Sequence, residues 1–127
     1  MKNIELINTV QGLIQAGCHY DIHELEKIYC QTLFIIILDE DGTTTSFNYT
    51  QNLDFFRSLK QNKAPPLDTT AVFNYADIKN DIGYVIVTRN LDLGHGLKKI
   101  VFNLMLRQTD NKKWQVFREH AVVIGNA

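Results

Sequence analysis

The sequence predicts a single α+β domain in which helices cover a mainly antiparallel sheet. Two observations indicate this class. Apolar residues in the first part of the chain recur at the three-to-four spacing of helices, and the second half is a series of apolar, strand-like runs separated by short turns. The 127 residues suit one domain spanning 1–127, and 45% hydrophobic with 21% charged residues is ordinary for a globular protein.

Two helices open the chain. Ile4 to Ala16 carries a wide apolar stripe, and Gly17 is the predicted C-cap. The second helix begins at Asp21, which forms a capping-box pattern with Glu24. The apolar face expected for this helix consists of Ile22, Leu25, Ile28 and Tyr29.

A hairpin and a third helix follow. Leu33 to Leu38 is rich in strand formers, and the acidic segment 39–42, which ends in glycine, turns it into the strand Thr43 to Tyr49. A helix is predicted from about Gln51 to Gln61, and Pro65-Pro66 prevents its continuation.

Four further strands come in series, and their tight connections make neighbouring strands antiparallel. Their expected bounds are Thr70–Asp77, Gly83–Leu93, Leu97–Gln108 and Trp114–Ile124. Gly94-His95-Gly96 joins two of these strands and opens no helix, so it is read as a turn and not as a phosphate-binding loop.

Both faces of the last strands are largely apolar. Side chains alternate across a strand, so one face of the last strand would hold Trp114, Val116, Arg118, His120, Val122 and Ile124. The opposite face, which includes Phe117, Ala121 and Val123, is also largely apolar. Three helices can cover only one side of the sheet. We therefore expect the other, convex side to pair with a second copy in a two-fold homodimer.

His120 and Arg118 are the candidate catalytic residues. If their face is concave, a histidine that titrates near neutral pH and a fixed cation stand side by side in a pocket. His120 would act as general acid or base, and Arg118 would stabilise developing negative charge or clamp a carboxylate. The alternative reading is that both are hydrogen-bonded groups at the edge of the core, or paired with acids.

A second set of residues is predicted to line the same pocket as a ligand-binding wall. Aromatic walls with a few polar tips suit a small molecule, whereas plain core packing explains each residue taken alone. The set consists of Tyr84, Thr88, Phe102, Trp114, Tyr29 and Phe56.

The sequence predicts no metal and no cofactor. His19 and His23 have the four-residue spacing of zinc ligands, but Asp21 starts a helix between them and breaks the shared face. The acidic turn around Asp39 lacks the bidentate acid of a calcium loop.

Charge and cysteine content bound the partners and the compartment. A net charge of −1 gives no reason to expect nucleic acid or a membrane as partner. Cys18 and Cys30 are read as reduced thiols, with a disulfide as the alternative, and a cytoplasmic location is expected because no secretory signal is visible.

The order helix, helix, hairpin, helix and four strands resembles the nuclear transport factor 2-like superfamily, which includes ketosteroid isomerase, scytalone dehydratase and the SnoaL-type polyketide cyclases. The residues that carry the resemblance are the segments Tyr20–Tyr29 and Trp114–His120. The resemblance is greatest to small uncharacterised bacterial members whose last strand carries a Trp-x-x-x-x-x-His pattern. It implies a cone-shaped, curved sheet with a pocket at the mouth, and a dimer through the convex face. The isomerase's tyrosine and carboxylate positions fall near Ile14 and Leu38, which cannot transfer a proton.

The predicted function is binding of a small, mostly apolar molecule that bears a carbonyl or carboxylate group, in the cone of the sheet. One alternative is a cofactor-free isomerase, dehydratase or cyclase that uses His120. The other is a structural dimer or partner-binding module with a filled cone.

Overall fold

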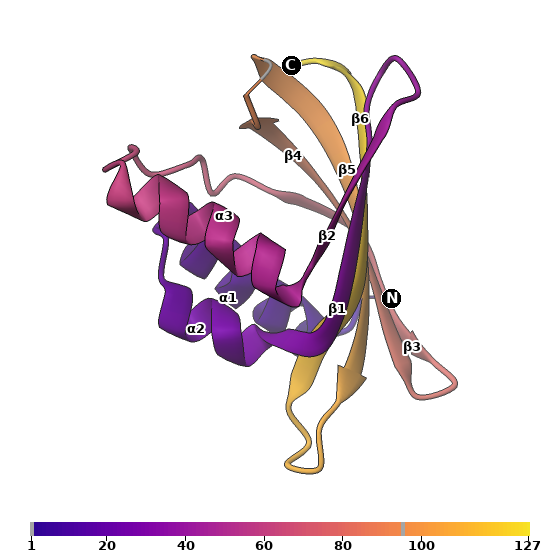
Figure 1. Ribbon diagram of the computed structural model, residues 1–127. Coiled ribbons are helices and arrows are strands. Elements are labelled where there is room, and N and C mark those ends of the chain that lie inside the picture. Colours follow the sequence, from indigo (N-terminus) through magenta and orange to yellow (C-terminus); the bar gives the residue numbers. More distant parts are fainter. Residues whose placement is uncertain (1, 95) are drawn as a thin grey trace.

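The computed structural model describes residues 2–94 and 96–127, which form one six-stranded sheet with three helices on one side (Figure 1). The strand order is β2-β1-β6-β5-β4-β3. All neighbouring strands are antiparallel except β1 and β6, which run parallel. This agrees with the α+β class and the mainly antiparallel sheet predicted from sequence. The predicted turn Gly94-His95-Gly96 is centred on His95, which lies outside the described residues.

The elements follow the expected order with small changes of boundary. In chain order they are α1 (Ile4–Cys18), α2 (Ile22–Ile28), β1 (Tyr29–Leu38), β2 (Thr44–Asn48), α3 (Tyr49–Gln61), β3 (Val72–Lys79), β4 (Ile82–Asp92), β5 (Leu97–Gln108) and β6 (Trp114–Asn126). None of the helices in the described part of the chain is long and apolar enough to cross a lipid bilayer.

Helix α1 lies across the inner face of the sheet and supplies much of the core. Asn3 caps its first turn by accepting the Leu6 N–H at 3.0 Å. The apolar stripe then buries Leu6 and Val10 completely. Gly17 is not the C-cap that its position suggested: it is helical, and the helix continues to Cys18. A Cβ built on Gly17 would lie 3.5 Å from the Phe56 ring of α3, which is ordinary van der Waals contact.

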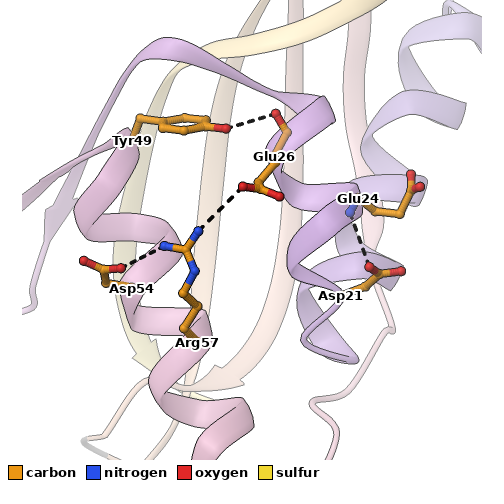
Figure 2. Close-up of polar contacts among 6 residues, drawn as sticks. All are labelled: Asp21, Glu24, Glu26, Tyr49, Asp54 and Arg57. Carbon is orange, nitrogen blue, oxygen red and sulfur yellow. Dashed lines mark hydrogen bonds and ion pairs between the residues drawn. The ribbon is translucent and has the colours of Figure 1, made fainter.

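Polar contacts join α2 to α3 (Figure 2). The predicted N-cap at Asp21 is present and accepts the Glu24 N–H. On α3, Arg57 donates to Asp54 at 2.8 Å and lies 3.6 Å from Glu26, and the Tyr49 hydroxyl donates to the Glu26 carbonyl at 3.1 Å. These contacts are exposed and individually weak, and those made by Arg57 and Tyr49 to Glu26 lie on the side of α3 that meets α2.

A full capping box starts α3 two residues earlier than predicted. Asn48 accepts the Gln51 N–H and the Gln51 side chain accepts the Asn48 N–H, both at 2.9 Å. This exchange satisfies two backbone donors and draws Tyr49 into the helix. Tyr29 was predicted on the apolar face of α2 but is the first residue of β1.

A β-bulge in β6 exchanges the two faces of that strand. Leu106 pairs with Val116 and Met105 pairs with Arg118, so Phe117 is the extra residue. Before the bulge the even-numbered residues, such as Trp114, face the core, and after it the odd-numbered residues do. The predicted single face that runs from Trp114 to Ile124 is therefore wrong.

The outer face of the sheet is free of helices (Figure 1). Three rows of paired residues cross its middle: Phe34, Arg118, Met105 and Tyr84; Ile36, His120, Asn103 and Ile86; and Leu38, Val122, Val101 and Thr88. We call these rows the outer face. Several of its apolar side chains are exposed, Phe34 to 41% and Tyr84 to 39%.

Candidate functional site

A cavity lies between the inner face of the sheet and the helices. Its volume is about 170 Å³, comparable with a cavity that holds a benzene molecule, which is about 150 Å³. The wall is mainly aliphatic and aromatic, with contributions from α1, α3 and strands β1, β2, β4, β5 and β6. A few polar side chains interrupt this wall: Cys18, Tyr29, Asn52, Arg89 and Glu119.

Glu119 is the buried acid of the cavity. It lies on β6 between Ile35 of β1 and Leu104 of β5, two apolar neighbours on the same face. Only 8% of the residue is exposed. Burial raises the pKa of Glu119 to about 7, and the positive charge of Arg89 opposes this rise. At neutral pH the carboxyl therefore exists in both protonation states.

Arg89 reaches the cavity from β4. Its Nη2 donates to the Asp68 carbonyl at 3.0 Å and to the Cys18 sulfur at 3.1 Å. The guanidinium carbon lies 5.7 Å from the centre of the Phe102 ring, which is a cation–π contact. These contacts hold the side chain in place. They leave its buried Nε without a hydrogen-bond partner among the described residues.

Asn52 and Tyr29 add two further donors. Asn52 is 6% exposed, and its buried Nδ2 has no partner in the described part of the chain. Desolvation and the charge of Glu119 raise the pKa of the Tyr29 hydroxyl well above its usual value. A contact with the Asn52 amide, which does not reach hydrogen-bond geometry, lowers this pKa only in part. Tyr29 therefore stays protonated and can donate. Buried donors without a partner are energetically costly, and Asn52 Nδ2 and Arg89 Nε are two such donors within the described residues.

The expected ligand-binding residues lie in three places. Tyr29, Phe56 and Phe102 line the cavity. Trp114 is buried in the core, where its Nε1 donates to Glu5 at 3.4 Å. Tyr84 and Thr88 are on the outer face, and the Thr88 hydroxyl donates to Asn74.

The structure places neither His120 nor Arg118 in the cavity. His120 is exposed on the outer face. Arg118 donates to the carbonyls of Thr32 and Phe117 at 2.8 and 2.6 Å, and so braces the bulge in β6. The prediction that both residues lie on the concave face is wrong, because that bulge turns their side chains away from the helices.

The zinc site and the disulfide that were weighed as alternatives from the sequence can be compared with the structure. His19 and His23 are both exposed, and the His19 ring lies 2.9 Å from the Gln15 carbonyl within its own helix. Among residues 2–94 and 96–127, no three His, Cys, Asp or Glu side chains gather where a metal ion could be held. Cys18 and Cys30 are free thiols.

Besides Cys18, three polar cavity residues were not predicted from the sequence. Arg89 and Glu119 are charged residues whose neighbours two positions away in the strand are apolar, which is a signal of an inward-facing charge. Asn52 precedes Phe56 by four residues and Leu59 by seven, so it occupies a position of the apolar stripe of α3.

Comparison with solved structures identifies the architecture. An NTF2-like protein of unknown function from Silicibacter pomeroyi superposes with a TM-score of 0.74 and 14% identity, over 94% of this chain and 93% of that one. An NTF2-like protein from Cytophaga hutchinsonii gives 0.73 and 18%, over 93% and 94%. The chain has the nuclear transport factor 2-like fold.

A third structure with this fold, from Streptomyces avermitilis, is named as a candidate dehydratase of the NTF2-like family. It matches with a TM-score of 0.69 and 14% identity over 94% of both chains. Scans against protein-family models and curated proteins find no match. At these sequence identities the similarity establishes the fold alone, so the function has to be inferred from the cavity.

Proposed function

We propose that this protein binds a small, mostly apolar molecule in the cavity through one carbonyl or carboxylate group. The observation that carries the proposal is the pair of unpartnered donors, Asn52 Nδ2 and Arg89 Nε, buried in an otherwise apolar wall within the described residues. A ligand oxygen would satisfy donors whose desolvation otherwise costs about 1–3 kcal/mol each.

The apolar wall would supply most of the affinity, and the donors would fix the orientation of the ligand. A hydrocarbon ring that leaves water for such a wall contributes roughly 25 cal/mol for each Å² that it buries. The cavity volume, about 170 Å³, suits a single ring with a short substituent.

The test is an NMR titration of methyl-labelled protein with benzamide, whose carbonyl is the acceptor and whose ring is the apolar body. Methyl shifts are expected at Val87, Leu104 and Ala121, which line the cavity. Ala121→Leu partly fills the cavity and should weaken binding at least tenfold. The matched control is Val122→Leu, one residue on and on the outer face. Binding that survives Ala121→Leu unchanged, or shifts confined to the outer face, would refute the proposal.

Proton transfer is the second candidate function, and the pKa of Glu119, at about 7, favours it. A carboxyl that titrates near the working pH is suited to general acid–base catalysis. The donors on Asn52 and Arg89 could hold a ketone oxygen and stabilise the enolate as it forms, while Glu119 takes the α-proton. This assigns the acid–base role expected for His120 to a residue that lines the cavity.

Deuterium uptake into cyclohexanone in D2O tests this candidate. The parent protein should accelerate exchange of the α-protons above the buffer rate, and Glu119→Gln should abolish the acceleration. His120→Gln is the control and should exchange like the parent. An exchange rate equal to that of buffer alone would leave binding as the function.

We also propose that the outer face joins two copies of the chain. The support is a helix-free sheet surface with exposed apolar side chains on adjacent strands, among them Phe34 and Tyr84. A two-fold axis brings such a face against itself and is the commonest solution for a homo-oligomer. A cytoplasmic location, and the lack of a nucleic-acid or membrane partner, stay predictions.

A further inference from the structure

The cavity offers several hydrogen-bond donors and one fixed positive charge. Donors come from four sources: the Tyr29 hydroxyl, the Asn52 amide, the Arg89 guanidinium and, when protonated, Glu119 itself. Arg89 carries a fixed positive charge. Its charge acts on Glu119, yet within the described residues no ion pair holds the two together. The guanidinium therefore has charge left to offer a ligand.

We infer that the preferred ligand is a small monocarboxylic acid, and that its carboxylate enters next to Arg89 and Asn52 while Glu119 takes up one proton. This rests on the proposed binding function and names the ligand class for the same cavity. A carboxylate satisfies several donors at once, because its two oxygens accept more hydrogen bonds than a carbonyl does.

The proton uptake follows from charge. Two carboxylates in one poorly solvated cavity cannot both stay ionised at moderate cost. Glu119 is already half protonated near neutral pH, because burial raises its pKa to about 7. A ligand carboxylate would raise this pKa further, and the protonated Glu119 would then donate a hydrogen bond instead of repelling the ligand.

We next consider whether another group near Glu119 could take up the proton in its place. From β4 comes the guanidinium of Arg89 and from β1 the hydroxyl of Tyr29, which stays protonated because its pKa is raised. Strand β5 and helix α3 contribute side chains that do not titrate, such as Leu104 and Asn52. Helix α1 contributes the Cys18 thiol, which the experiment tests directly.

Calorimetric titration of the parent protein with benzoate and benzamide tests the inference. Benzoate is ionised throughout the range used, so any pH dependence comes from the protein. Its affinity should fall about tenfold from pH 7.5 to pH 8.5, the limit for one linked proton. Titrations in buffers of different ionisation enthalpy should show uptake approaching one proton per benzoate at pH 8. Benzamide affinity should stay constant within twofold over the same range.

Variants locate the proton. Glu119→Gln should bind benzoate with no pH dependence and no proton uptake, and Cys18→Ser should keep both. The proton uptake of the parent tests the inference even if a variant fails to fold. Benzoate binding without proton uptake, or benzamide binding without benzoate binding, would overturn the inference and leave the proposed function standing. If neither compound binds, the proposed function fails and the inference fails with it.

Discussion

Glu119 is a buried acid whose protonation is linked to the stability of the fold. Its carboxyl is buried between apolar neighbours, and its pKa is raised from 4.5 to about 7. The folded state therefore binds this proton more tightly than the unfolded state does. Since unfolding then releases a proton, the contribution of Glu119 to the free energy of unfolding is fully present below pH 4.5 and is lost as the pH rises through 7.

The first prediction concerns this residue. Replacing Glu119 by Gln removes the titrating group, so the variant should gain up to about 3 kcal/mol over the parent at pH 8 and little at pH 4. Urea unfolding of both proteins at the two pH values measures this difference. A parent and variant whose stability difference is the same at pH 4 and pH 8 would show that Glu119 titrates normally.

Single residues also show where sequence reasoning succeeds. Tyr29, Phe56 and Phe102 were expected in the cavity wall and lie there. Tyr84 was placed on the wrong side, because both faces of β4 carry apolar residues and alternation alone does not say which face meets the helices. The charge of Arg89 within the same strand was the available signal.

Strand β6 shows why His120 and Arg118, the two expected catalytic residues, do not line the cavity. The predicted bounds of the strand were nearly correct, but one extra residue at Phe117 reverses the side chains from Arg118 to Val123. A bulge has no regular sequence pattern. Arg118, which binds the carbonyls of Thr32 and Phe117, stabilises it through contacts that only the folded chain makes.

Close packing of α1 on β4 gives the second prediction. A Cβ at Gly83 would lie 2.6 Å from Leu6, which is fully buried. Gly83→Ala should therefore destabilise the fold by about 1–3 kcal/mol, the usual cost of overpacking.

The matched control is Gly12→Ala, at an exposed position of helix α1. The nearest atom to a Cβ there is 4.0 Å away, and the change should stabilise by about 0.5–1 kcal/mol through helix propensity. Thermal unfolding compares the two variants. Equal effects at the two positions would contradict the packing of α1 on β4.

The whole molecule has one sheet face covered by helices and one face uncovered (Figure 1). The order of elements and the one-sided covering were predictable, because they follow from hydrophobic period and turn residues. The parallel pairing of β1 with β6 was not, since it joins segments from opposite ends of the chain. The cavity depends on that pairing, which places Ile35 beside Glu119.

The third prediction concerns assembly. The parent should have twice the protomer mass of 14.6 kDa in solution. Phe34→Glu places a charge on the outer face, where burial against a second copy is unfavourable, and should yield the protomer mass. The control variant Ser58→Glu, at an exposed position of α3, should remain dimeric. Light scattering coupled to gel filtration measures all three, and a monomeric parent would remove the proposed interface.

A crystal structure of the protein soaked with benzamide is the decisive test of ligand binding in the cavity. We expect electron density for the ring against Phe102 and Leu104, with the carbonyl oxygen within hydrogen-bond distance of Asn52 or Arg89. A solid interior with no space for the ring, or density only on the outer face beside His120, would contradict it.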